Sequence, residues 1–321
     1  MIGIIGAGRM ALEHFKVLNH LNKDVIFFAN KGESAKQIAK MTSKTVITDN
    51  YLNSAELRNL DQVIVASPID TLLYITIELV KHKIDSILVE KPLVMNKTDF
   101  DLLRKFPNHR NIFVGFNRRF YKSVQECIRI CDNDGGIRSC TFSFDENIRN
   151  WKHPYNVLST FEGKNPIISQ SSHLIDLVFH LIGIPKSIEI KAIKPSSVIN
   201  DQIIYGVGES VRDIPFVFMS DWSTPGNWKI ELNTNNYKLI LSPLETLRIT
   251  NFTRNDGVNI ENQWLKTVKI LDSDEFDTKF KPGIYQQDLA FINRDFDRLL
   301  GLAEYEEAFS FIEKIQNVFK N

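Results

Sequence analysis

The chain has 321 residues, which is long for one compact core and suits two domains. Its 39 Lys and Arg residues balance 39 Asp and Glu residues, so no positive surplus is available to drive nucleic-acid binding. No apolar run reaches the length of a membrane span, the 3 Cys are few, and the first strand begins too early for a leader. We therefore expect a cytoplasmic protein that binds a small molecule and has no nucleic-acid or membrane partner.

The N-terminus predicts a phosphate-binding loop between a strand and a helix. A short apolar strand at 2–5 is followed by a G-x-G-x-x-A sequence, and apolar residues then recur at helical spacing over 12–21. Gly6 allows a tight turn, Gly8 lets the backbone approach a pyrophosphate, and Ala11 lets helix and strand pack closely. The helix N-terminus would supply N–H groups for the phosphates. The expected cofactor-binding residues of this loop are Gly6, Ala7, Gly8, Arg9, Met10 and Ala11.

Apolar strands alternate with helical segments in the rest of the first third of the chain. Further strands are expected at 24–29, 45–48, 61–66, 84–89 and 111–115, with helices at 34–41 and 71–82. Six strands with helical crossovers predict a doubly wound parallel sheet, a Rossmann domain over residues 1–120. Ser67 and Pro68 follow the fourth strand, at the sheet edge where such folds bind ligands.

Glu90-Lys91-Pro92 follows the apolar fifth strand. Pro lacks the backbone donor that an inner strand needs, so the strand should end where the acid and the lysine emerge. At this edge Glu90 would border the cofactor, and Lys91 would be available for chemistry. The alternative interpretation is a solvated Glu–Lys pair at a strand end.

The residues after the second strand bear on the choice of cofactor. NAD-preferring Rossmann domains place an acid there to bind the ribose 2′-hydroxyl. Here Asn30 and Lys31 follow the strand instead. Asn30 would not repel a 2′-phosphate and Lys31 could pair with it, so we expect NADP to be favoured over NAD. Alternatively, Lys31 points to solvent and the site accepts either cofactor.

An apolar helix expected at 169–183 carries three ionisable residues at spacings of three and four. His173, Asp176 and His180 would lie on neighbouring turns of one face. Burying each without a partner would cost roughly 1–3 kcal/mol, so they should face a cavity or one another. A functional site is the favoured interpretation, and a structural polar network is the alternative. No other segment has metal-ligand spacing, so no metal is expected.

The remaining segments predict a second domain over residues 121–321. A helix is expected at 121–130, and helices at 285–300 and 305–319 would close the chain. Strands of a second sheet are expected at 139–144, 187–192, 202–207, 215–221, 227–234 and 237–241. Together with the Rossmann domain, these segments place the chain in the α/β class.

Taken in order, these motifs resemble the Gfo/Idh/MocA family of NAD(P)-dependent sugar oxidoreductases. The resemblance is carried by the G-x-G-x-x-A loop, Glu90-Lys91-Pro92, Asn117-Arg118-Arg119-Phe120, and Ser172-His173 with Asp176 and His180. It implies that the second domain is an α/β domain with an open, mainly antiparallel sheet. It also implies hydride transfer at a secondary alcohol or ketone carbon of a sugar, and a homo-oligomer.

By the same resemblance, Lys91, Asp176 and His180 form the catalytic set. Lys91 would polarise the sugar oxygen, and His180 would be the general acid or base because its ordinary pKa near 6.5 suits proton exchange at neutral pH. Asp176 would orient that pair. Asn117 would help to position the nicotinamide, and Arg119 either the nicotinamide or the substrate.

Two further segments bear on the substrate and on turnover. The stretch from Trp151 to Tyr155 is similar to a segment of family members linked to bacterial surface sugars, which would point to a surface-glycan precursor. An aromatic loop packed on the domain is the favoured interpretation. Asn165-Pro166 stands where the family usually has a Gly-Gly pair, which is an argument for a catalytically silent cofactor-binding regulator, whereas the retention of Lys91 and His180 argues against it. An imine or tetrapyrrole reductase on the same architecture is a third alternative. The candidate substrate residues are Arg119, Trp151, Tyr155 and His173.

Overall fold

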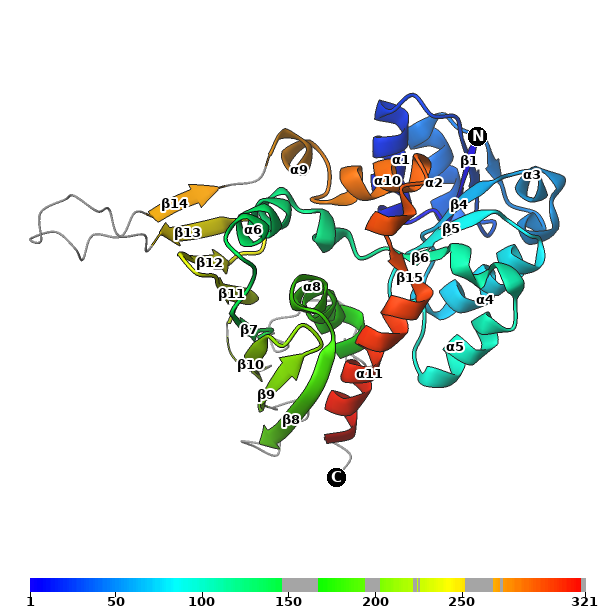
Figure 1. Cartoon of the computed structure of the whole chain (residues 1–321). Helices are drawn as coiled ribbons and strands as arrows, with labels where there is room; N and C mark the ends of the chain where they lie inside the picture. The colour runs from blue at the N-terminus through cyan, green and yellow to red at the C-terminus, as the bar shows by residue number, and fades with distance from the viewer. Residues whose placement is uncertain are drawn as a thin grey trace, which may run out of the picture. The chain divides into compact units, whose positions relative to one another are not determined.

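The computed structural model describes residues 1–145, 167–193, 203–221, 224, 226–251, 268–271 and 274–318 (Figure 1). It divides the chain into two compact units. The first unit contains Met1–Asn117 and Phe276–Ser310, and the second contains Arg118–Glu275 and Phe311–Asn321. The expected division lay near residue 120 alone. The difference arises because the chain returns to the first unit after residue 275 and adds a strand and several helical segments to it.

The first unit is built on a seven-stranded sheet. Its strands are β1 (Ile2–Ile5), β2 (Val25–Phe28), β3 (Val46–Ile47), β4 (Gln62–Val65), β5 (Ser86–Val89), β6 (Ile112–Val114) and β15 (Leu300–Gly301). Their order is β15-β6-β5-β4-β1-β2-β3, with β15 antiparallel to β6 and all other pairs parallel. The six parallel strands confirm the predicted doubly wound sheet. Their order reverses between β1 and β4, which is where such sheets bind ligands.

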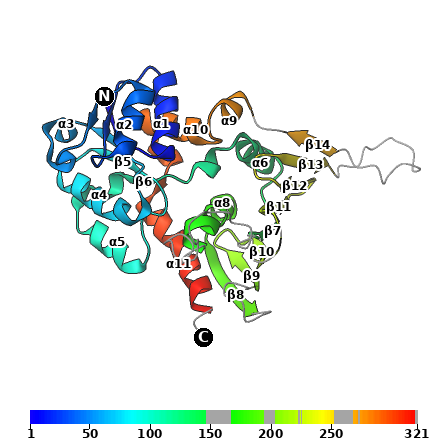
Figure 2. The same ribbon diagram turned by 180° about the vertical axis from the view of Figure 1, so that it is seen from behind.

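Helices connect these strands, and further helices follow in the C-terminal segment of the chain. They are α1 (Arg9–His20), α2 (Glu33–Thr42), α3 (Ala55–Arg58), α4 (Ile69–Lys81), α5 (Lys97–Arg104), α9 (Glu275–Lys279), α10 (Ile284–Ile292) and α11 (Leu302–Val318). In Figures 1 and 2, α10 lies beside α1. The sequence predicted one helix over 285–300, but α10 ends at Ile292. Arg294 adopts a left-handed conformation (φ 60°), and the chain then extends into β15.

The second unit contains an eight-stranded sheet. Its strands are β7 (Ser139–Ser143), β8 (Pro185–Ile193), β9 (Ile203–Ser210), β10 (Pro215–Asp221), β11 (Lys229–Asn233), β12 (Tyr237–Leu241), β13 (Leu247–Asn251) and β14 (Val268–Leu271). They lie in the order β14-β13-β12-β11-β7-β10-β9-β8, and only β7 and β10 pair in parallel. This confirms the open, mainly antiparallel sheet that the resemblance implied. The sequence analysis missed β13 and β14.

Two helices and the end of α11 cover one face of the second sheet. Phe142, Phe218 and Ile230 are paired neighbours across β7, β10 and β11, and all three are buried. Helix α8 (Ser172–Ile182) packs Phe179 against Phe216, and α11 packs Phe311 against Phe218, with ring centroids 6.3 and 5.6 Å apart. Helix α6 (Lys122–Asn133) packs on β12 and β13. The functional helix predicted from its polar spacing is therefore anchored by its apolar face.

Candidate functional site

The turn from β1 into α1 has the geometry of a phosphate-binding loop. Gly6 has a φ of +127°, and a Cβ there would lie 2.2 Å from the Ala66 carbonyl oxygen, so only glycine fits. A Cβ on Gly8 would meet nothing within 4 Å. Gly8 is the N-cap of α1 and makes no side-chain cap, which leaves the first-turn N–H groups open to an anion. Ala11 is fully buried where the helix meets the strand.

The Glu90-Lys91 dipeptide emerges from the carboxyl end of β5, as the position of Pro92 predicted. Strand β5 ends at Val89, and the Glu90 N–H continues the edge by donating to the Val65 carbonyl at 2.8 Å. Pro92 is buried, whereas Glu90 and Lys91 are partly exposed. On the neighbouring strand β4, Ser67 follows the end of the strand and Pro68 is the N-cap of α4. These residues lie at the ligand-binding edge of the sheet.

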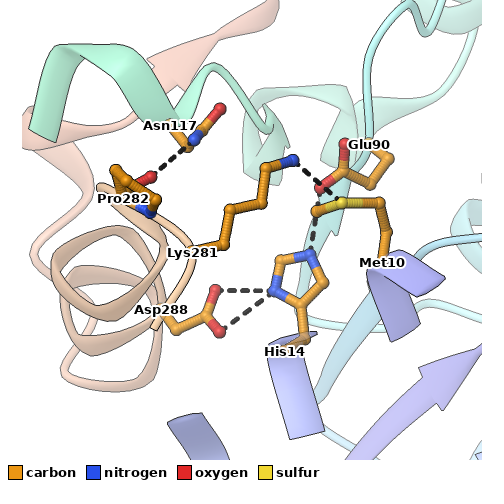
Figure 3. A network of polar contacts seen from close by, with 7 residues as sticks. All are labelled: Met10, His14, Glu90, Asn117, Lys281, Pro282 and Asp288. Atoms are coloured by element: carbon orange, nitrogen blue, oxygen red, sulfur yellow. Dashed lines mark hydrogen bonds and ion pairs between the residues drawn. The ribbon is translucent and has the colours of Figure 1, made fainter. Parts of the chain in front are cut away.

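A histidine that the sequence analysis did not single out links this edge to α10. The His14 Nδ1 lies 2.8 and 3.0 Å from the two carboxylate oxygens of Asp288, and its Nε2 lies 3.1 Å from Glu90 Oε1 (Figure 3). The side chains of His14 and Asp288 are 1% and 0% exposed. The cluster therefore joins α1, the end of β5 and α10 through charged groups shielded from water.

The charges of this cluster reinforce one another. Burial alone would lower the pKa of His14, but the charges and hydrogen bonds of Asp288 and Glu90 raise it to about 10. Burial opposes ionisation of Glu90, yet His14, Lys281 and Lys91 together lower its pKa. Burial raises the pKa of Asp288, against the attraction of His14. His14 therefore carries the positive charge of the cluster at neutral pH.

The segment that precedes α10 contacts the end of the predicted phosphate loop at Met10. The Lys281 ammonium donates to Met10 Sδ at 3.0 Å, and the Asn117 amide donates to the Pro282 carbonyl at 2.7 Å (Figure 3). Asn117 is 3% exposed, so its side chain is committed to this backbone contact. Asn117, predicted to contact the cofactor, thus holds the segment that carries Lys281.

The second unit contains a buried ion pair on α8. Arg119 donates from Nε and Nη2 to the two carboxylate oxygens of Asp176, at 2.8 and 2.6 Å. Both side chains are at most 5% exposed. This fork-shaped pairing is the strongest geometry available to an Arg–carboxylate pair. The structure therefore joins two predicted site residues, but it makes Arg119 the ion-pair partner of Asp176.

His180 is partly buried and has cationic neighbours. Burial and the positive charges of Arg119 and Arg212 lower its pKa from 6.5 to about 3. The argument that an ordinary pKa near 6.5 suits His180 for proton exchange is therefore wrong. The imidazole is neutral at physiological pH, and it can donate or accept a hydrogen bond to an oxygen. His173, two turns earlier on α8, is 8% exposed.

The other predicted residues lie on the surface or outside the described ranges. Asn30 and Lys31 follow β2 and are exposed, as is Arg9. The first turn of α2 contributes Glu33, an acid that is 72% exposed and pairs with Lys36 at 3.9 Å. The residues that fall outside the described ranges are Trp151, Tyr155, Asn165 and Pro166.

The described part of the chain contains neither a metal-binding cluster nor a membrane-spanning helix. Within residues 1–145, 167–193 and the later described segments, no group of three or more His, Cys, Asp or Glu side chains is arranged to hold a metal ion. Among the helices of these same residues, none is long and apolar enough to cross a bilayer. The cytoplasmic location stays a prediction from composition.

The comparisons with known proteins agree with this geometry. Residues 1–113 match the model of the GFO_IDH_MocA family, described as an oxidoreductase family with an NAD-binding Rossmann fold. This N-terminal region is similar to the Gfo/Idh/MocA family. The match confirms the resemblance carried by the motifs and, at the level of the family, the predicted class of nicotinamide-dependent oxidoreductase. A search of curated protein sequences found no significant match.

Solved structures of dehydrogenases share the fold of nearly the whole chain. UDP-N-acetylglucosamine 3-dehydrogenase GnnA from Acidithiobacillus ferrooxidans is 13% identical with a TM-score of 0.75, over 99% of this chain and 96% of that one. Levoglucosan dehydrogenase in complex with NADH is 13% identical with a TM-score of 0.77 over the same shares. An oxidoreductase from Agrobacterium radiobacter in complex with NAD+, L-tartaric acid and magnesium is 13% identical with a TM-score of 0.72, over 100% and 96%. At these identities the likeness establishes the fold.

Sequence reasoning missed three residues of the first unit: His14, Lys281 and Asp288. Asp288 left only a weak signal, because it follows Gln286 and Gln287 in α10, although its side chain is fully buried. His14 lies on the buried side of α1 next to Phe15, where a polar ring needs partners. Their pairing could not be read from the sequence, because 274 positions separate the two residues.

Proposed function

We propose that the chain is an NAD(P)-dependent oxidoreductase that moves a hydride between the nicotinamide and a secondary alcohol or ketone carbon of a sugar or sugar derivative. In the oxidising direction the substrate carbon gives its hydride to NAD(P)+, the hydroxyl proton leaves to a base, and the ketone and NAD(P)H remain. The observation that carries the proposal is the open cradle at Gly6–Gly8, on the same sheet edge as Lys91. The match of residues 1–113 to the model of an NAD-binding oxidoreductase family supports a nicotinamide cofactor.

Lys91 is proposed as the group that polarises the reacting oxygen. An ammonium stabilises the negative charge that develops on an alkoxide-like oxygen during hydride transfer, and such electrostatic stabilisation is usually the largest catalytic contribution. Glu90 beside it supplies a counter-charge, since Lys91 is one of the cations that lower the Glu90 pKa. Both residues sit on a short strand end rather than on a long loop, which favours fixed geometry.

Residues of α8 and its neighbour are proposed to bind the substrate. A neutral His180 is suited to a hydrogen bond with a sugar hydroxyl, and Arg119 donates to the Asp176 carboxylate on the same helix. His173 is proposed as a further substrate contact because of its place on the same helix. Carbohydrates and their nucleotide conjugates are the proposed substrate class, supported by the fold shared with dehydrogenases of UDP-N-acetylglucosamine and of levoglucosan.

NADP(H) is the proposed preferred cofactor. The proposal rests on Asn30 and Lys31 at the end of β2, where no acid stands to repel a 2′-phosphate. Glu33 in the first turn of α2 is the nearest acid along the chain, and its side chain is exposed and faces Lys36. The proposed preference is modest, because an exposed lysine contributes little through a screened charge.

The test of the proposed function is a turnover screen followed by absorbance of the reduced nicotinamide at 340 nm. The purified chain is mixed with NAD+ or NADP+ and with free sugars, anhydrosugars and UDP-linked sugars, and with the corresponding ketones for the reverse direction. Reduction of the cofactor by at least one carbohydrate supports the proposal. Tight nucleotide binding without turnover across the panel would favour the regulator, and turnover of a cyclic imine or a tetrapyrrole alone would favour the other reductase.

A homo-oligomer is proposed through the face of the second sheet on which β9 and β10 carry exposed apolar side chains. Val207 on β9 lies directly opposite Val217 on β10, and Tyr205 lies opposite Met219, and all four side chains are exposed. A row of apolar cross-strand pairs on an exposed sheet face is typical of an interaction surface. Light scattering of the wild type and of Val217→Lys tests it: a dimer or tetramer that dissociates in the variant supports the proposal, and a monomeric wild type overturns it.

A further inference from the structure

The two ring nitrogens of His14 face different carboxylates, Nδ1 that of Asp288 and Nε2 that of Glu90. Each faces a carboxylate, so each must carry a proton if both carboxylates are ionised. If a proton moves from Nδ1 to Asp288, the ring becomes neutral, but Nε2 still carries its proton and still donates to Glu90. Asp288 therefore fixes the donor role of Nε2 in both protonation states, much as a carboxylate fixes a catalytic histidine through its far nitrogen.

We propose that His14 and Asp288 are positioning residues for the Glu90-Lys91 dipeptide, with Asp288 directing the His14 Nε2–H onto the Glu90 carboxylate so that Glu90 stays ionised and fixed beside Lys91. The inference rests on the proposed function, in which Lys91 polarises the reacting oxygen. It assigns a role to α10, a helix contributed by the C-terminal return of the chain.

The charge and burial of the cluster indicate that His14 and Asp288 position Glu90, and that they do more than attach α10 to the first unit. A fully buried Asp288 is costly to ionise unless a cation compensates it, and His14 provides that cation at 2.8 Å. Glu90 is faced by His14 from α1, by Lys281 from the segment before α10, and by its neighbour Lys91. Asp288 is faced by His14, Glu90 and Gln287. The carboxylate of Glu90 is thus the point at which the buried cluster meets the partly exposed lysine.

The chain offers a matched control for simple anchoring of α10. The Gln62 amide donates to the Phe291 carbonyl at 2.8 Å, which ties β4 to the end of the same helix at a point outside the cluster of His14, Glu90 and Asp288. Gln62 is buried, as His14 is. Gln62→Leu should therefore weaken the attachment of α10 to the sheet, as changes in the cluster do. It should leave the ionisation and the position of the Glu90 carboxylate unchanged.

The first experiment needs no turnover. Nitrogen-15 shifts of His14 and carbon-13 carboxyl shifts of Glu90 are followed by NMR between pH 5 and 9 in the wild type, His14→Gln, Asp288→Asn and Gln62→Leu, on the protein with bound NADP+. We expect a protonated Nε2 and an ionised Glu90 throughout in the wild type and in Gln62→Leu. Glu90 should begin to titrate within the range in His14→Gln. A wild-type His14 with an unprotonated Nε2 at pH 7 would overturn the inference, whatever the enzyme does.

The second experiment measures kcat and the Kd for NADPH in the same four proteins. Residues that orient a functional group from behind typically contribute on the order of 10- to 100-fold. We expect that loss in kcat for His14→Gln and Asp288→Asn. In the control Gln62→Leu, both kcat and the Kd for NADPH should stay within about threefold of the wild-type values. Unchanged kcat in both cluster variants, or an equal loss in Gln62→Leu, overturns the positioning role while the proposed function stands. A wild type without carbohydrate turnover removes the proposed function and leaves the NMR experiment to decide the charge assignment.

Discussion

Two histidines of this chain, one in each unit, are driven to opposite charge states by their neighbours. His14 is buried between two carboxylates, and its pKa is raised to about 10. His180 is partly buried beside two guanidinium groups, and its pKa is lowered to about 3. Burial opposes the charged form in both, so the sign of the surrounding charge decides the outcome. The same side chain is thus a fixed cation in the first unit and a neutral hydrogen-bonding group in the second.

The ion pair of the second unit offers the largest test of this comparison. Asp176→Asn removes the bidentate carboxylate that faces a buried Arg119, and breaking such a pair from one side typically costs roughly 3–5 kcal/mol. We expect urea denaturation to show a loss of that size in the free energy of unfolding. Asp99→Asn is the control, because this buried carboxylate accepts only backbone N–H groups at the start of α5 and should cost about 1 kcal/mol. Equal losses in the two variants would show that the Arg119 pairing adds nothing.

Lys91 of the first unit provides the second test, on catalysis. Lys91→Ala should lower kcat on the order of 10²- to 10³-fold, the scale of removing one electrostatic stabiliser, while NADPH binding stays close to that of the wild type. Turnover and NADPH fluorescence titration are measured side by side. Lys97→Ala, an exposed lysine at the start of α5, is the control and should behave as the wild type. Full turnover in Lys91→Ala would remove the residue from the mechanism.

The two histidines predict opposite dependences of stability on pH. The His14 pKa is raised on folding from 6.5 to about 10, so its contribution is complete below pH 6.5 and is lost as the pH rises toward 10. The His180 pKa is lowered to about 3, so the unfolded chain binds the extra proton and stability falls as the pH drops from 6.5 toward 3. Each effect has a limiting slope of about 1.4 kcal/mol per pH unit.

Thermal melts of the wild type, His14→Gln and His180→Gln across this pH range measure the two slopes. The advantage of the wild type over His14→Gln should shrink above pH 6.5. In contrast, the stability of His180→Gln relative to the wild type should increase as the pH falls below 6.5. Parallel curves for the wild type and His180→Gln would show that Arg119 and Arg212 do not set the charge of this imidazole.

The sequence predicted the parts of the sites that depend on local backbone rules. Gly6 and Pro92 were assigned correctly because a left-handed turn and a strand end each leave a signature in one or two residues. Helix α5 had a comparable signal that the sequence analysis overlooked, since Asn96 and Asp99 form a capping box at its start. Local patterns of this kind also sufficed to place the six parallel strands of the first sheet along the chain.

The parts that the sequence did not predict depend on partners distant in the chain. Asp176 was expected to act with His180, four residues away, but its bidentate partner is Arg119, 57 positions earlier. The shift of the His180 pKa requires Arg119 and Arg212, which lie on different segments. The return of the chain to β6 through β15 involves only two residues, Leu300 and Gly301, which is too short for a strand pattern to reveal.

The smallest expected effect concerns the exposed end of β2, where no burial amplifies a charge. Lys31 and Asn30 are both exposed, and an exposed ion pair contributes up to about 1 kcal/mol, which corresponds to a change of roughly fivefold in Kd. We expect the wild type to bind NADPH more tightly than NADH. Lys31→Ala should weaken the binding of NADPH by that factor and leave the binding of NADH unchanged.

Asn30→Asp should shift the preference toward NADH, because its carboxylate repels the 2′-phosphate and can accept a hydrogen bond from the ribose 2′-hydroxyl. Lys36→Ala, one turn into α2 and paired with Glu33, is the matched control and should leave both constants unchanged. Competing titrations at low and at high salt decide the question, since a screened charge loses its effect as the ionic strength rises. Tighter binding of NADH by the wild type at low salt would contradict the predicted preference.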